Sequence, residues 1–177
     1  MRRLRLFVFF LLAACGWQHR VKYLSDEEFN AYYALKPFMS EEMQKSFLTL
    51  KTEPERTAYM KSVRLERVPP ITLYDLFYQY DEHIRQAIVD GAVQTGWTKD
   101  QVLMSWGPPY DKKKLVGRPA PRSEMLVYKF ERQEDGSVLV YTPDSKTEYK
   151  AVERFRREVI LDSDVVTEII EKPGWGN

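Results

Sequence analysis

The 177-residue chain has one cysteine and two histidines. One cysteine cannot form an intramolecular disulfide, so the fold must rest on its packed core. His83 has Gln79 and Ala87 at positions i−4 and i+4, so it lacks the helical partner of a zinc ligand pair. Nucleotide-binding glycine motifs and a Gly-x-Ser-x-Gly elbow are missing as well. We therefore expect that the protein is not an enzyme and that it binds neither a metal nor a cofactor.

Long apolar stretches are also missing: the strongly apolar run Leu6–Leu12 (LFVFFLL) has seven residues, and no later stretch approaches about 18 apolar residues. As a helix, Leu6–Leu12 would span about 10 Å, roughly a third of a bilayer core, so it is too short for a transmembrane anchor. The basic stretch Met1–Arg5 precedes it and Ala13-Ala14 follow it. A positive, an apolar and a small-residue region in this order predict a secretory signal peptide.

Leu12-Ala13-Ala14-Cys15 resembles the lipobox of bacterial lipoproteins. The resemblance implies that residues 1–14 are removed and that Cys15 carries acyl chains that hold the protein in a membrane. With Gly16 as the second mature residue, it also implies the outer membrane, on the periplasmic side. The alternative is conventional cleavage that leaves a free thiol.

The charges of the chain nearly balance. Removal of Arg2, Arg3 and Arg5 with the leader would reduce the 27 basic residues to 24, against 26 acidic ones. A balance of this kind argues against a general nucleic-acid-binding protein.

Hydroxyl-acid pairs predict short helices that begin after Ser25, Ser40 and Thr52, with aromatic faces that pack together. A longer helix is expected over Leu73–Val93, and a short one from Thr98 to Trp106 that ends at Gly107. The predicted organisation is a signal peptide (1–14), a tether (15–22), a helical segment (23–70), an α+β domain (71–172) and a tail (173–177).

After residue 120 the period of the sequence changes to that of strands. Strands are expected over Glu124–Glu131, Ser137–Thr142, Tyr149–Leu161 and Val165–Glu171. Gly136 and the sequence Asp162-Ser-Asp164 mark turns between neighbouring strands. Helices followed by an antiparallel sheet of about four strands define the α+β class.

The segment 112–122 is the best candidate for a binding surface, because it has five cations and no acid: Lys112, Lys113, Lys114, Arg118 and Arg122. Arg154, Arg156 and Arg157 are expected to add to it. A positive loop beside a membrane favours anionic lipid headgroups or an acidic protein partner. A solvated loop is the alternative. Trp175, in the tail, is expected to be an interfacial anchor, an interaction residue or disordered.

Two families resemble residues 23–130. Gly96-Trp97, Thr98 and Asp100, followed by Trp106-Gly-Pro-Pro109, are similar to the GWxTD domain, although Lys99 separates the Thr from the Asp and Trp106 replaces a Tyr. The second family is the SmpA/OmlA (BamE-like) domain of small outer-membrane lipoproteins. Gly96, Thr98, Val102, Gly107 and Pro109 fit its spacing. Both resemblances imply a non-catalytic, periplasm-facing module that holds partners or lipid.

Together, these features predict a non-catalytic outer-membrane lipoprotein that acts as an accessory or scaffold in cell-envelope assembly, with assembly of β-barrel proteins as the resemblance implies. Its expected partners are the membrane, an envelope protein and anionic lipid, without nucleic acid. One alternative is a lipid-anchored component of a secretion, motility or adhesion apparatus. Another is a membrane-tethered hydrolase.

Overall fold

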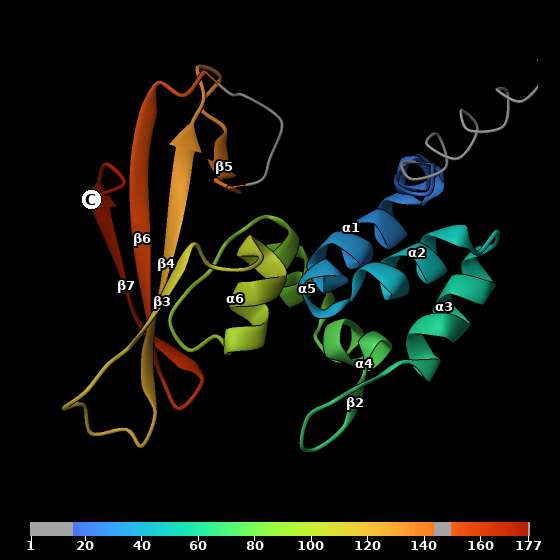
Figure 1. The fold of residues 1–177 in the computed structure, drawn as a ribbon, viewed down its shortest axis with the longest axis horizontal. Helices are drawn as coiled ribbons and strands as arrows, with labels where there is room; N and C mark the ends of the chain where they lie inside the picture. Colours follow the sequence, from blue (N-terminus) through green and yellow to red (C-terminus); the bar gives the residue numbers. More distant parts are fainter. Residues whose placement is uncertain (1–15, 144–149, 177) are drawn as a thin grey trace, which may run out of the picture. The chain divides into compact units, whose positions relative to one another are not determined.

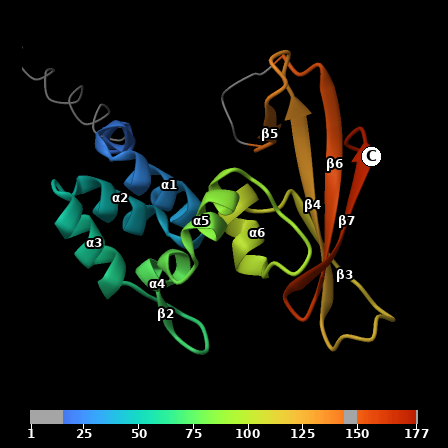
Figure 2. The ribbon, with the colours of Figure 1, turned by 180° about the vertical axis from the view of Figure 1, so that it is seen from behind.

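The structure, a computed structural model, describes residues 16–143 and 150–176 (Figures 1 and 2). The chain folds into two compact units, one up to Arg85 and one from Gln86 onwards. Cys15 and the rest of the proposed lipobox lie outside the described residues. In the described ranges no helix is long and apolar enough to cross a membrane.

The first unit is helical (Figure 1). Its elements are η1 (Gln18–Tyr23), α1 (Asp26–Leu35), η2 (Lys36–Phe38), α2 (Glu41–Thr49), α3 (Glu53–Ser62), β1 (Arg64–Leu65), β2 (Ile71–Thr72) and α4 (Leu73–Tyr78). The three predicted helix starts are confirmed, because Ser25, Ser40 and Thr52 each accept a hydrogen bond from the backbone N–H three residues on. Ser25 and Thr52 complete their capping boxes with Glu28 and Glu55. These local contacts fix where the helices begin.

Aromatic side chains form the centre of the helical unit, as predicted. The rings of Tyr32 and Phe47 stack with centroids 5.6 Å apart, and Tyr59 lies 6.5 Å from Phe47. Tyr32, on α1, and Phe47, on α2, are both buried. Aromatic contacts therefore tie α1, α2 and α3 together.

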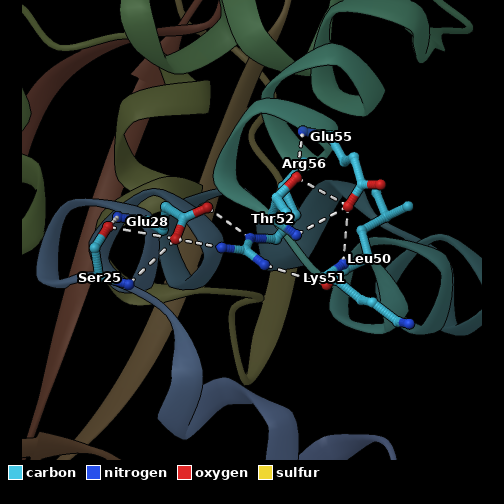
Figure 3. A network of polar contacts seen from close by, with 7 residues as sticks. All are labelled: Ser25, Glu28, Leu50, Lys51, Thr52, Glu55 and Arg56. Atoms are coloured by element: carbon cyan, nitrogen blue, oxygen red, sulfur yellow. Dashed lines mark hydrogen bonds and ion pairs between the residues drawn. The ribbon is translucent and has the colours of Figure 1, made fainter.

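A buried ion pair reinforces this core (Figure 3). Arg56 on α3 donates from Nε to Glu28 Oε1 over 2.6 Å and from Nη2 to Oε2 over 2.8 Å. Its Nη1 donates to the carbonyl oxygen of Leu50 at 3.1 Å. The two side chains are only 8% and 6% exposed. Burial alone would raise the pKa of Glu28, but hydrogen bonds from Arg56 and Ser25 outweigh it and lower the pKa below 4.5.

Two segments differ from the sequence-based expectations. The helix expected over Leu73–Val93 is interrupted: α4 ends at Tyr78 and α5 spans Glu82–Val89. The second helix begins after Asp81, a residue type that favours helix starts. The backbone carbonyl oxygen of Asp81 accepts a hydrogen bond from the N–H of Arg85. In place of a free tether, residues 18–23 form η1, and Arg20 Nη1 donates to the Thr49 carbonyl at 2.9 Å.

The second unit contains the rest of α5, helix α6 (Lys99–Trp106) and the sheet. Its strands are β3 (Asp111–Lys114), β4 (Ser123–Arg132), β5 (Val138–Val140), β6 (Glu153–Asp162) and β7 (Val165–Pro173). The order is β3-β4-β6-β7, all pairs are antiparallel, and β5 also pairs with β4. The predicted α+β class is confirmed. The fifth strand, β3, lies in the segment that we expected to be a loop.

Helix α6 covers one face of the sheet. The ring of Trp106 packs edge-on against Tyr128 and Phe130 of β4, with centroids 5.2 and 5.1 Å away. Phe130 in turn stacks on Phe155 of β6. Gly107 ends α6 with a φ of 73°, a conformation that favours glycine and agrees with the prediction for this position. This face forms the core of the unit.

Removal of one charge from the buried pair tests its contribution. Glu28→Gln leaves Arg56 buried without a counter-charge, so the free energy of unfolding should fall by about 3–5 kcal/mol in urea titrations followed by circular dichroism. The exposed neighbour Glu27 provides a control, since Glu27→Gln should change it by less than about 0.5 kcal/mol. The double substitution Glu28→Met/Arg56→Met should recover much of the loss. If Glu28→Gln and Glu27→Gln lower the free energy of unfolding equally, this role for the ion pair is contradicted.

Candidate functional site

A hollow of about 500 Å³ lies where β3, the start of β4 and the start of α6 come together. It contains three of the predicted site residues and four that we did not predict: Lys112, Lys114 and Arg122, with Lys99, Ser123, Glu124 and Asp164. We call it the basic hollow, because four of its side chains are cations and two are acids. All seven belong to the sheet unit.

The register between β3 and β4 explains which lysines line the basic hollow. Lys114 lies opposite Glu124, and Lys112 lies opposite Leu126. Since side chains alternate along a strand, Lys112, Lys114 and Glu124 share one face of the sheet, and Lys113 lies on the other. Lys113 there contacts Asp111, with Nζ 3.7 Å from the carboxylate. Three consecutive lysines therefore do not form one patch.

Glu124 is the centre of the charge arrangement. Lys99 and Lys112 each bind one of its oxygens, over 2.5 and 2.9 Å. Burial acts to raise the pKa of Glu124, but the hydrogen bonds from the two lysines outweigh it, and the pKa is lowered. The same contact raises the pKa of Lys112. Glu124 is therefore ionised at neutral pH and holds both ammonium groups in place.

The turn between β6 and β7 provides the second acid. Ser163 and Asp164 have φ values of 51° and 65°, which agrees with the turn expected there. Lys99 donates its backbone N–H to the Asp164 carbonyl, and Arg122 Nη2 contacts the Asp164 carboxylate over 3.1 Å. Both side chains of this ion pair are largely exposed, so it contributes little to stability.

Arg118 does not line the basic hollow. Its guanidinium binds both oxygens of Asp162, over 2.9 and 2.7 Å. Ser123 and Thr167 also donate hydrogen bonds to this carboxylate. The bond from Arg118 is the main reason that the pKa of Asp162 lies far below its usual range. Arg118 thus connects the loop after β3 to the end of β6.

The arginines of β6 do not join this surface either. Arg154 pairs with Glu131, Arg156 pairs with Glu158, and Arg157 pairs with Glu171. Arg154 and Arg156 lie on the sheet face opposite the basic hollow, whereas Arg157 shares its face but lies 5.0 Å above the ring of Phe130 and does not line the hollow. The expectation that all three would extend the basic segment is therefore wrong.

Lys114 differs from the other cations of the basic hollow, because no carboxylate of the described residues forms an ion pair with it. Together with the net excess of two positive charges, this side chain allows the hollow to attract a carboxylate or a phosphate group. Lysines on an edge strand also have a structural use, since they discourage pairing with the strands of other molecules. Lys112 and Lys114 line the basic hollow, whereas Lys113, on the other face of the sheet, does not.

Three charged residues of the basic hollow were missed by the sequence analysis: Lys99, Glu124 and Asp164. Lys99 lies 13 residues before Lys112 and Asp164 lies 42 residues after Arg122, so only the fold brings them close. Glu124 lies only two residues after Arg122 but belongs to β4. The sequence does offer one signal for Glu124, because this residue begins the predicted strand that follows the basic segment. Counting charges within residues 112–122 alone left Glu124 out.

Trp175 is neither freely exposed nor without contacts. Its Nε1 donates to the carbonyl oxygen of Phe130 over 3.0 Å. The ring lies 4.5 Å from Tyr141, and the guanidinium of Arg154 lies 4.6 Å above it. The segment after β7 is therefore fixed to the sheet, which corrects the expectation of an exposed or disordered tryptophan.

No protein-family model, curated protein or solved structure matches this chain. The resemblances to the GWxTD and BamE-like domains therefore stay predictions from a few residues. In residues 16–143 and 150–176, no group of three or more His, Cys, Asp or Glu side chains could hold a metal ion.

The lowered pKa values predict how stability depends on pH. In the unfolded chain the carboxyl groups of Glu28, Glu124 and Asp162 regain ordinary pKa values, so below about pH 5 the unfolded state binds more protons. The three carboxylates contribute fully to the free energy of unfolding above these ordinary pKa values. This contribution is lost as the pH falls through the lower pKa values of the folded state. The melting temperature should therefore decrease steadily from about pH 5 to pH 3. Asp162→Asn should make this decrease smaller, and a melting temperature that rises on acidification would contradict the assignment.

Proposed function

We propose that this chain is a lipid-anchored accessory or scaffold protein of the bacterial outer membrane, which faces the periplasm and takes part in envelope assembly without catalysis. The observation that carries the proposal is the sequence Leu12-Ala13-Ala14-Cys15 after a short apolar run. Acyl chains on Cys15 would hold the protein at the membrane without a spanning helix.

The contacts of the basic hollow support a binding role. Three of its four cations, Lys99, Lys112 and Arg122, are held in place by Glu124 and Asp164, so most of the site is organised before any ligand arrives. An acidic group of a partner protein can bind Lys114 directly and compete with Asp164 for the exposed side chain of Arg122. Anionic lipid is the second ligand of the same chemistry. We therefore place the envelope partner at this site.

Substitution of the cysteine tests the anchor. Cys15→Ser removes the acyl acceptor, so the protein should leave the membrane fraction and should no longer incorporate a labelled fatty acid. Fractionation of cells and detection of the label measure both effects. Unchanged acyl labelling of the variant would refute the anchor.

A crosslinking experiment tests the partner. Mild crosslinking in cells, followed by purification and mass spectrometry, should recover an envelope protein, and subunits of the β-barrel assembly machinery are the expected ones. Lys112→Gln/Lys114→Gln should reduce this recovery in a salt-dependent way, because two cations of the basic hollow are lost. Lys113→Gln is the matched control and should keep it. If barrel-assembly subunits are absent from the wild-type sample, the proposed role in barrel assembly fails.

A further inference from the structure

Three exposed aromatic side chains lie on η1 and α1. Tyr23, which ends η1, is 72% exposed, and Phe29 and Tyr33 on α1 are 42% and 46% exposed. Phe29 and Tyr33 are four residues apart and therefore neighbours on one helix face, with ring centroids separated by 4.6 Å. We call these three residues the aromatic stripe. Clustered apolar surface of this kind marks a contact site more often than single exposed residues do.

Cations flank the aromatic stripe at both ends. The ammonium of Lys22 lies 5.0 Å from the ring centroid of Tyr23, and that of Lys36 lies 5.6 Å from the ring of Tyr33. Asp26, in the first turn of α1, lies on the same side of the helix. Aromatic rings with a polar edge and lysines with long apolar stems are the side chains that prefer the boundary between a membrane and water.

The stripe also lies close to Cys15 along the chain. Two residues, Gly16 and Trp17, separate Cys15 from the start of η1, and the three Cα–Cα steps from Cys15 to Gln18 span at most about 11 Å. Residues 18–23 form η1, and the rise of a 3₁₀-helix adds about 10 Å. Arg20 fixes η1 to the Thr49 carbonyl. An anchor at Cys15 therefore keeps Tyr23 within roughly 20 Å of the acylated residue.

We propose that the aromatic stripe lies in the headgroup region of the membrane, as a second and non-covalent contact beside the acyl anchor. This inference rests on the proposed lipid anchor at Cys15. The short connection holds the stripe at the membrane surface, where burial of its rings no longer costs the entropy of a separate binding event. Lys22 and Lys36 complement the negative charge of headgroups. The face of α1 opposite the stripe stays in the core, with Ala31 and Leu35 buried.

A probe at Phe29 tests the contact on the mature, membrane-bound protein. Acylated Cys15 has no free thiol, so Phe29→Cys provides the only site for a nitrobenzoxadiazole label. In bilayer nanodiscs its emission should shift to shorter wavelength, and lipids with a nitroxide at headgroup depth should quench it. Ala58→Cys, an exposed position on α3 of the same unit, is the matched control. Quenching at residue 29 should exceed that at residue 58 several-fold.

Two further measurements separate the possible failures. The mass of the N-terminal peptide shows whether Cys15 is acylated, and an unmodified cysteine would refute the anchor. On protein with the acylated mass, equal quenching at residues 29 and 58 would overturn the membrane contact. So would a label at residue 29 that is shielded from water but not quenched by nitroxide lipid, because a second copy or a protein partner would then cover the stripe. Tyr23→Ser/Tyr33→Ser should reduce the quenching at residue 29 while circular dichroism stays unchanged.

Discussion

Both units of this protein depend on the internal pairing of charges that folding removes from water. In the helical unit, the ion pair of Glu28 and Arg56 lies within the packing of α1 and α3, where an unpaired charge would cost several kcal/mol. In the sheet unit, Glu124 and Asp162 are less deeply buried, and Lys99, Lys112 and Arg118 pair with them. Without disulfides, each unit must satisfy these charges through its own elements. The positions of the carboxylates therefore constrain how helices and loops can be arranged.

How far the fold follows from the sequence depends on the range of each interaction. Capping boxes such as Ser25 with Glu28 lie within four residues, and they correctly predicted where helices begin. The strand pattern from Glu124 onwards predicted the sheet because alternation is also local. By contrast, Lys112–Lys114 have no apolar alternation, and they form a strand only because β4 offers a free edge. The interruption between α4 and α5 was hidden, because the apolar residues on either side continue one helical pattern.

The candidate site shows the same division. Charge counting found Lys112, Lys114 and Arg122, since the segment contains no acid. Charge counting does not show on which face of the sheet a side chain lies, so it treated Lys113 as equivalent to Lys112 and Lys114. Nor does it show that Asp162, 44 residues from Arg118 in the chain, binds that arginine. Most of the apparent positive surface is therefore neutralised inside the fold. Lys114 and the exposed part of Arg122 are what remains for a ligand, which is a smaller site than the sequence suggests.

The basic hollow and the aromatic stripe, the two surfaces proposed for binding, would bind through different interactions. At the basic hollow, an arriving anion can bind Lys114 directly but must compete with Asp164 for Arg122, so its affinity should be moderate and salt-dependent. At the aromatic stripe, Lys22 and Lys36 lie over the rings of Tyr23 and Tyr33, and transfer of the rings from water is favourable by itself. A surface of the first kind suits reversible recognition of an acidic partner. A surface of the second kind suits permanent contact with a membrane, and its residues lie on η1 and α1, the first two helical elements after Cys15 in the described residues.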